Sequence, residues 1–520
     1  MNRKDNMVRL RENREWDILV VGGGATGLGI AVDAASRGYA VALVDKDDFA
    51  KGTSSRSTKL VHGGVRYLAQ GNIKLVREAL RERGMLLKNA PHLTRRQSFI
   101  VPTFSIWEKF YYGVGLGLYD LLAGKLQLGS VKLLGKKQVL AQMPMIRAKG
   151  LSGGIEYVDG QFDDARLAIS MAETANEQGG CLVNYVEVEK LIRENKKVKG
   201  AVVFDHLSRE SFEVRAKVVI NATGVFADDL IAMDNEESLP MVSPSQGVHL
   251  VVDRKFFPGG TALMIPKTDD DRVLFAVPWS GKLVLGTTDT PVDEVNDEPV
   301  ALEEEIRFII SHFNRYSSSV IQRSDVLSVF AGLRPLVKSA ATTTTALISR
   351  DHTILVSNTG LITIIGGKWT TYRKMAMDAL RNAIFVGKLE SRACVTENLK
   401  IHGWVEQVDV NDHLHFYGLD AKRIREFVKR DAELGKLLHP AYPFIKAEVV
   451  WAVRNEMAMT VEDVLARRIR LLFLDARAAV EVARVVAELM ATEMGKSVGW
   501  VEEQVNAFES LASNYILSRD

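Results

Sequence analysis

Cysteine is nearly absent from this chain. Cys181 and Cys394 are the only two in 520 residues, and neither belongs to a Cys-x-x-Cys motif. Two distant cysteines exclude a disulfide framework and a cysteine-based zinc motif, and they suit a reducing compartment. A surplus of either charge is missing as well, because the formal net charge is only +2. This balance argues against nucleic acid as a partner, since nucleic-acid binding depends on a strongly basic surface.

Long apolar runs are also missing. The most apolar uncharged run, residues 110–119, has ten residues, whereas about 20 are needed to span a bilayer. Residues 1–15 mix Arg and Lys with Asp and Glu and contain no apolar core. They therefore predict neither a signal peptide nor a transit peptide. We expect a protein that does not cross a membrane, although it could lie on one.

The stretch that organises the chain is a glycine motif near the N-terminus. An apolar run predicts a buried strand over 18–21, a small-residue helix follows over 28–36, and a second strand over 40–44 ends in Asp45. The glycines between the first strand and the helix are Gly22, Gly24 and Gly27. This βαβ pattern is typical of a dinucleotide site. The alternative is a glycine-rich turn in an unrelated α/β protein.

Each residue of the motif has a physical role in such a site. Gly22 allows the tight turn, Gly24 lets the backbone approach a pyrophosphate, and Gly27 lets the helix pack against the strand. The helix N-terminus directs unpaired N–H groups at the phosphates. Asp45 can accept hydrogen bonds from a ribose diol.

A small, hydroxyl-rich loop follows over residues 49–68. Its Ser and Thr hydroxyls and glycine backbone suit contact with phosphate, a ribityl chain or a flat ring. The alternative is a polar surface loop, but basic residues lie among its glycines, where chemistry often occurs. The candidate cofactor residues here are Thr53, Ser54, Ser55, Ser57, Lys59, His62 and Gly64.

Two later segments repeat the strand-and-small-residue pattern. An apolar strand from Val218 ends in Ala-Thr-Gly, and another from Gly360 leads into a glycine turn and a helix. The second turn comes more than 300 residues after the first, so the cofactor domain should be discontinuous. The candidate cofactor residues in these segments are Ala222, Thr223, Gly224, Gly366, Gly367, Lys368 and Thr370.

The rest of the chain divides into two patterns. Residues 241–346 contain short alternating runs, which predict a largely antiparallel sheet on the substrate side. Beyond about residue 400 the patterns favour helices and an accessory domain without a catalytic constellation. The predicted helices cover 421–438, 445–455, 460–471, 476–493 and 498–513. Thr460 and Asp463 resemble a capping box.

Two segments allow more than one interpretation. Residues 104–128 are rich in aromatic and apolar side chains, so they form either a membrane-interface segment or a packed helical hairpin. Residues 154–167 predict a strand that turns into a helix capped by Asp163 or Asp164. There we expect Asp163, Asp164 and Arg166 to pair locally.

Taken in order, these stretches resemble the FAD-dependent glycerol-3-phosphate dehydrogenases, a flavin family distinct from the soluble NAD-linked enzymes. Two departures from the family pattern are small: Asp45 stands where flavoproteins often have Glu, and Gln246 where the family often has Lys. The matching segments are 20–27, 54–68, 157–167, 221–224, 246–252, 286–290, 332–336 and 366–374, with 451–456 and 465–470 in the tail.

The resemblance implies an α/β + α fold with three parts. A discontinuous FAD-binding Rossmann-like domain would comprise 1–100, 150–228 and 350–398. An antiparallel-sheet substrate domain would comprise 101–149 and 229–349, and a C-terminal helical domain 399–520. In the cofactor domain, the glycine motif would hold the ADP half of FAD.

The resemblance also implies a reaction: oxidation of sn-glycerol 3-phosphate to dihydroxyacetone phosphate, with a hydride passing from C2 to flavin N5. A phosphate dianion requires cations, for which Arg334 and Arg350 are the candidates. Lys368 could stabilise the developing alkoxide or the reduced flavin. The general base would be His249 or His62, since a guanidinium such as Arg334 loses a proton less readily. The alternatives are surface ion pairs for the cations and a satisfied core histidine for His249.

The expected electron acceptor is a membrane quinone, because the long insertion typical of the oxygen-using oxidases is absent. We therefore expect a cytoplasmic enzyme, peripheral on the inner face of the cell membrane, possibly a homodimer, with no metal site and no EF-hand. Three alternatives remain: an oxygen-using glycerol-3-phosphate oxidase, a related flavin enzyme acting on an amine, D-amino acid or 2-hydroxyacid, and a flavin-binding structural or sensor protein.

Overall fold

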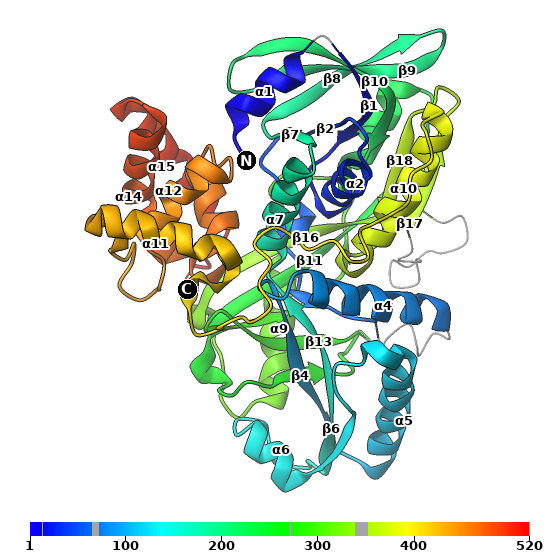
Figure 1. The fold of residues 1–520 in the computed structure, drawn as a ribbon. Helices are drawn as coiled ribbons and strands as arrows, with labels where there is room; N and C mark the ends of the chain where they lie inside the picture. Colours follow the sequence, from blue (N-terminus) through cyan, green and yellow to red (C-terminus); the bar gives the residue numbers. More distant parts are fainter. Residues whose placement is uncertain (13, 65–71, 271, 339–351, 519–520) are drawn as a thin grey trace.

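The computed structural model describes residues 1–12, 14–64, 72–270, 272–338 and 352–518. Within this part, two sheets form the body of the molecule and a bundle of helices from the C-terminal part packs beside them (Figure 1). The predicted α/β + α class is confirmed. No helix of the described residues is both long and apolar enough to span a bilayer.

The first sheet contains the glycine motif. β1 (Glu15–Val21) pairs in parallel with β2 (Val41–Val44) and β10 (Glu210–Asn221), and β10 pairs in parallel with β18 (Ile362–Gly366). The carboxyl ends of these four strands therefore meet at one edge. The chain returns to this sheet late, as the second glycine turn predicted. The remaining strands are β7 (Cys181–Val183), β8 (Val186–Glu194), β9 (Lys197–Asp205) and β17 (His352–Val356).

Helices cover both faces of this sheet. α2 (Ala25–Ser36) packs between α7 (Asp164–Glu177) and α10 (Tyr372–Gly387) on one face (Figure 1). Their small apolar side chains allow close approach, and together with the strands they form a continuous core. On the other side α1 (Arg3–Arg11) buries Met7 and Leu10 against β7 and β10.

The second sheet contains β11 (Val242–Asp253), β12 (Ala262–Ile265), β13 (Leu274–Trp279), β14 (Lys282–Gly286), β15 (Thr290–Pro291) and β16 (Val326–Val337). These pair antiparallel, as the alternating runs predicted. α9 (Glu303–Tyr316) covers one face.

Strands from earlier in the chain also join this second sheet. β4 (Thr94–Thr103) pairs antiparallel along its whole length with β6 (Gly153–Phe162), and β4 pairs in parallel with β12. β3 (Leu60–Val61) and β5 (Lys132–Gly135) pair with β6. The cofactor loop therefore runs directly from the first sheet into the second.

Three further helices precede or interrupt these strands. They are α4 (Ile73–Asn89), α5 (Ile106–Ala123) and α6 (Lys136–Gln142). The aromatic segment is thus one long helix, α5, rather than a helical hairpin.

The C-terminal helices largely follow the predicted ranges. They are α11 (Ala421–Arg430), α12 (Lys446–Asn455), α13 (Leu471–Leu474), α14 (Ala476–Met494) and α15 (Val498–Ser513), preceded by the 3-10 segment η8 (His413–Asp420). The predicted helix over 460–471 is instead a π-helical turn, η10 (Asp463–Arg468). Its capping box is present, because the Thr460 hydroxyl accepts from the Asp463 N–H and the Asp463 carboxylate accepts from the Thr460 N–H.

Candidate active site

The glycine turn after β1 has no room for side chains. Gly22 has a φ of +107°, and a Cβ there would lie 2.6 Å from the Ala222 carbonyl oxygen. A Cβ on Gly27 would lie 1.8 Å from the Gly22 carbonyl oxygen. The N-terminus of α2 is capped from outside, since the Ala25 N–H donates to the Ser54 hydroxyl at 2.9 Å. These contacts leave the open backbone that a pyrophosphate requires.

Asp45 lies beside this turn, at the end of β2. Its carboxylate accepts from the Gly23 N–H at 2.5 Å and from the Asp47 N–H at 2.8 Å. Burial, together with the neighbouring Asp47 charge, raises the pKa of Asp45 to about 7. A carboxyl group of this kind can accept from, or donate to, a ribose hydroxyl.

Two cavities adjoin at the carboxyl edge of the first sheet. The first is lined by Gly22, Gly24, Asp45, Ser54, Ala222, Thr223 and Gly224, among others. The second is lined by Ser57, His62, Gly64, His249, Arg334 and Thr370, among others. Both are lined by Thr53, Pro335, Gly366, Gly367, Lys368 and Trp369. The two cavities thus form one elongated space, with a nucleotide end at the glycine turn and a second end against β11 and β16.

The wall of the second end is built by β11 and β16. In their antiparallel register Ser245 opposes Arg334, Gly247 opposes Gly332, and His249 opposes Phe330. Alternate residues of a strand and their cross-strand partners share a face. His249 and Arg334 therefore project from the same face, with only glycines between them.

His249 is almost fully buried, at 2% exposed, and stacks on Phe330 with ring centroids 4.8 Å apart. Its Nε2 lies 2.8 Å from the Thr58 hydroxyl oxygen. Burial, together with the charges of Lys59 and Arg334, holds the pKa of His249 well below its ordinary value. The imidazole is therefore neutral near pH 7 and has a lone pair that can accept a proton.

Arg334 is held in place by the loop after β14. Its guanidinium donates to Asp289 Oδ1 at 3.1 Å and to the Thr288 carbonyl at 2.9 Å. Gly247 makes room for it, because a Cβ there would lie 2.3 Å from Arg334 Nη2. The result is a half-buried cation with a set orientation at the cavity wall.

Lys368 lies where the two cavities meet, directly after the Gly366-Gly367 turn. Both glycines have φ above +80°, a conformation that other residues rarely adopt. Thr370 joins this turn to the cofactor loop, because its hydroxyl lies 3.3 Å from both the N–H and the carbonyl oxygen of His62.

Not every predicted residue lines the cavities. Gly27 packs α2 on the turn, and Ser55 is buried. Lys59 is completely buried, and its ammonium donates to Asp164 at 2.7 Å and to the Ser55 carbonyl at 2.7 Å. Arg350 lies outside the described residues.

The expectation of local pairing at the start of α7 is wrong. Asp163 caps the helix by accepting from the Arg166 N–H. Asp164 instead accepts from Lys59 and Ser57 of the cofactor loop and from Arg470 at 3.1 Å. The Arg166 guanidinium pairs with Glu456 through two contacts of 2.8 Å. These partners lie more than 100 residues away in the sequence, so a local pattern could not reveal them.

Sequence reasoning missed several residues at the site. Thr58, Thr287 and Asp289 contact His249 or Arg334. Thr287 and Asp289 lie within the matching segment 286–290 and Thr58 within 54–68, and this membership is the signal that could have identified them. Arg470, in the supposed accessory domain, donates to the Ser55 carbonyl at 2.8 Å and so supports the cofactor loop directly.

Comparison with known proteins defines the family. The model of the FAD dependent oxidoreductases matches residues 17–373, and that of the C-terminal domain of alpha-glycerophosphate oxidase matches 357–504. A probable mitochondrial glycerol-3-phosphate dehydrogenase of Caenorhabditis elegans is 42% identical, over 95% of this chain and 73% of its own length. The human mitochondrial glycerol-3-phosphate dehydrogenase is 40% identical, over 95% and 72% respectively. The chain belongs to the FAD-dependent glycerol-3-phosphate dehydrogenases.

Solved structures agree with this membership. The glycerol-3-phosphate dehydrogenase of Bacillus halodurans, complexed with FAD, has a TM-score of 0.82 at 30% identity and covers 100% of this chain and 98% of its own. The Mycoplasma pneumoniae alpha-glycerophosphate oxidase, at 18% identity, shares the fold over 75% of this chain with a TM-score of 0.57.

FAD, the cofactor of this dehydrogenase family, fits the residues present. The glycine turn provides the close backbone approach for the pyrophosphate, and Asp45 lies where a ribose would be bound. The elongated space continues from there to His249 and Arg334. It can therefore accommodate an extended dinucleotide with one end at the glycine turn and the other toward His249 and Arg334.

Proposed function

We propose that this protein oxidises sn-glycerol 3-phosphate to dihydroxyacetone phosphate. The observation that carries the proposal is the pairing, on one face of β11 and β16, of an oriented cation with a neutral, buried histidine. Bound FAD supplies the hydride acceptor for C2. The protein itself must supply a site for the substrate phosphate, an acceptor for the hydroxyl proton and contacts that fix the orientation of the substrate.

Arg334 is the proposed phosphate ligand. Arg–phosphate contacts are strong because both groups are charged. They are also oriented, because the planar guanidinium donates two parallel hydrogen bonds to the phosphate oxygens. The guanidinium already donates to Asp289 and to the Thr288 carbonyl, and these hydrogen bonds fix its orientation. A substrate phosphate can therefore meet a cation that does not reorganise on binding. Lys368, at the junction of the cavities, is the proposed stabiliser of the developing alkoxide.

His249 is the proposed proton acceptor for the C2 hydroxyl. Its low pKa keeps the ring neutral before substrate binds, and the Thr58 hydroxyl at Nε2 also lines the cavity. A proton leaving the substrate can reach Nε2 directly or through Thr58. His62 also lines this cavity, and it remains the other candidate.

Replacing Arg334 tests this function. In Arg334→Met we expect kcat/KM for glycerol 3-phosphate to fall by at least about 30-fold, because loss of a buried charge-assisted contact costs about 2 kcal/mol or more. Turnover of glycerol, which has no phosphate, should fall much less. Arg315→Met, which removes an exposed arginine that pairs with Asp269, is the control. A variant that keeps the wild-type preference for glycerol 3-phosphate over glycerol, with FAD bound, would contradict the proposal.

We further propose that the electron acceptor is a membrane quinone and that α5 rests on the inner face of the cell membrane. Most of the outer face of α5 is apolar, and its most exposed side chains are Ile106, Trp107, Phe110, Tyr111 and Leu121, at 65–82%. Contiguous apolar patches rimmed by polar residues mark interaction sites. Exposed Lys132, Lys136 and Lys137 lie on the following segment and suit anionic headgroups.

The inner face of α5 reaches the cofactor loop. The Tyr119 hydroxyl accepts from the Gly63 N–H at 2.6 Å and donates to Asp159 at 2.7 Å. One helix thus joins the proposed membrane face to the wall of the cavity. In α1, Arg3 and Arg11 are less suited to binding anionic headgroups than the lysines after α5, because they already pair with Asp205 and Glu210.

A further inference from the structure

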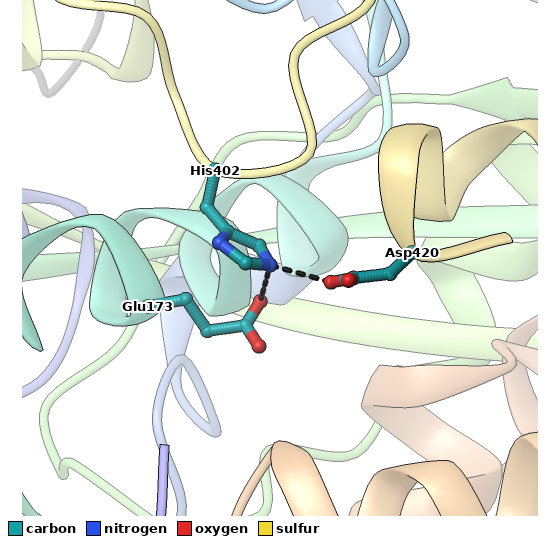
Figure 2. A group of neighbouring side chains, drawn as sticks. All are labelled: Glu173, His402 and Asp420. Atoms are coloured by element: carbon teal, nitrogen blue, oxygen red, sulfur yellow. Dashed lines mark hydrogen bonds and ion pairs between the residues drawn. The ribbon is translucent and has the colours of Figure 1, made fainter. Parts of the chain in front are cut away.

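A second cluster of chemistry-bearing side chains lies away from the cavities, where the C-terminal helices meet the first sheet. Glu173 lies on α7, His402 on the connection after α10, and Asp420 at the end of η8 (Figure 2). His402 Nε2 is 2.6 Å from Asp420 Oδ2 and 3.6 Å from Glu173 Oε2. One atom from each residue lies within 4.8 Å of the others.

The other ring nitrogen of His402 is also occupied. Nδ1 lies 2.6 Å from Glu177 Oε1, one helical turn beyond Glu173. This contact sets the ring orientation and turns Nε2 toward Glu173 and Asp420. Histidines that bind metals are commonly held in this way, with a carboxylate on the second nitrogen.

Glu173 makes the longest contact of the three, 3.6 Å to His402. Its side chain is only 5% exposed, and within the described part of the chain it accepts no hydrogen bond. Figure 2 shows its carboxylate directed at the same point as His402 Nε2 and Asp420. The nearest large cation on α7, Arg166, pairs with Glu456 instead. A largely buried carboxylate whose nearest printed donor lies beyond hydrogen-bond distance, here His402 at 3.6 Å, is stabilised when an ion or a water completes its contacts.

Negative charge is in excess around this point. Three carboxylates, those of Glu173, Glu177 and Asp420, surround one imidazole. In the described part of the chain, Arg423 pairs with one of the three, Asp420, at 3.2 Å. A divalent cation would balance this charge.

We propose that Glu173, His402 and Asp420 bind a divalent transition-metal ion such as Zn²⁺, through Oε2, Nε2 and Oδ2, with water completing the coordination. One imidazole with two carboxylates suits zinc and its neighbours, and it does not suit Ca²⁺ or Mg²⁺, which take oxygen ligands. The three ligands come from α7, the connection and η8. The ion would therefore tie the helical domain to the nucleotide-binding sheet, far from the reaction.

Metal binding at this site must displace a proton. Both ring nitrogens of His402 lie 2.6 Å from carboxylate oxygens, which accept hydrogen bonds, so both nitrogens carry a proton before an ion binds. Because Nε2 can bind a metal only without its proton, each ion should release about one proton at pH 7. An ion held loosely at surface carboxylates would release none.

The test uses the FAD-loaded enzyme after EDTA treatment. Titration with ZnSO₄, followed by calorimetry in two buffers of different ionisation enthalpy, should show one saturable ion and release of about one proton. Zn²⁺ should also raise the Tm. His402→Gln and Glu173→Gln should abolish this binding event, whereas His439→Gln, which removes a partly buried histidine paired with Glu481, should leave it intact. Steady-state activity should not change in any of these proteins.

A variant that keeps all three ligands distinguishes weaker metal binding from a loss of folding. Glu177→Gln should weaken Zn²⁺ binding by about 10- to 100-fold through loss of the orienting carboxylate, with an unchanged Tm in EDTA. Absence of saturable binding, binding without proton release, or full binding by His402→Gln would each overturn the proposal.

Discussion

The Arg166–Glu456 pair offers a direct measure of what holds the helical domain to the nucleotide-binding sheet. The two side chains are 3% and 1% exposed and meet through two contacts of 2.8 Å. Trp451 Nε1 also donates to Glu456 at 3.1 Å. Removing one member leaves the other as a buried charge without its partner.

The expected cost follows from this geometry. Stranding one charge of a buried, hydrogen-bonded pair costs about 3–5 kcal/mol. When the helical domain opens away from α7, the stranded charge becomes hydrated and the cost disappears. The opening equilibrium should therefore rise by roughly two to three and a half orders of magnitude, at about 1.4 kcal/mol for each factor of ten.

Native-state hydrogen exchange measures this opening. In Arg166→Met and in Glu456→Gln, amides of α12 and residues 456–469 should lose protection by the predicted factor. Arg454→Met is the matched control on the same helix, because Arg454 is 53% exposed and pairs with Glu493 at the surface. Loss of the Arg454–Glu493 pair should change the hydrogen-exchange protection factors by less than about fivefold, since exposed pairs contribute about 1 kcal/mol at most.

The double variant Arg166→Met/Glu456→Leu decides between charge and packing. Replacing both charges with apolar side chains leaves no buried charge, so protection should recover most of its wild-type value. If the double variant exchanges as fast as the single variants, the pair acts through shape rather than charge and the reasoning fails.

Two further predictions concern acid stability and the membrane face. His92 is 2% exposed, and burial and the Arg166 charge lower its pKa to about 4. In the unfolded chain His92 binds a proton below about pH 6.5, whereas in the folded protein it stays neutral down to about pH 4. The free energy of unfolding is therefore unaffected by His92 above pH 6.5. About 3 kcal/mol is then lost as the pH falls to 4. His92→Leu should flatten the fall of Tm between pH 6.5 and 4, whereas His206→Gln, at a half-buried histidine, should not. Parallel curves for His92→Leu and wild type would refute this. Replacing Trp107, Phe110 and Leu121 together by Ser should reduce sedimentation with anionic vesicles and quinone reduction by at least tenfold while preserving dye-linked activity. Equal retention on vesicles, or a wild-type protein that dimerises through α5, would count against membrane contact.

The nucleotide-binding unit could be predicted from sequence because its determinants are local. Gly27 is required by a contact with Gly22, five residues earlier, and the strands on either side of α2 contain continuous apolar runs. The late return of β18 was also predictable, because its glycine turn repeats the pattern of the first. The C-terminal helix over 498–513 has the same bounds in the structure, since its apolar positions recur at helical spacing.

The features that the sequence did not predict depend on contacts between residues that lie far apart in the sequence. Lys59 has the setting of a cofactor residue, but it pairs with Asp164, which is 105 residues away. The predicted helix over 460–471 becomes a π turn in which Arg467 and Arg468 both contact Asp48, more than 400 residues away. Arg470 follows with a φ of +62° and contacts the cofactor loop. Such conformations are stabilised by tertiary contacts that helix propensity does not encode.

The late arrival of β18 and Arg470 has a consequence for synthesis in the cell. The glycine turn emerges first, but the turn at Gly366 that completes its cavity is made 344 residues later (366 − 22). At about 5–20 residues per second, this interval is roughly 20–70 s. Until then Ile220 and Asn221, at the carboxyl end of β10, lack their neighbours on β18, and the cofactor loop lacks the support of Arg470. We therefore expect the complete FAD site to form late in translation, once Gly366 and Arg470 have been made.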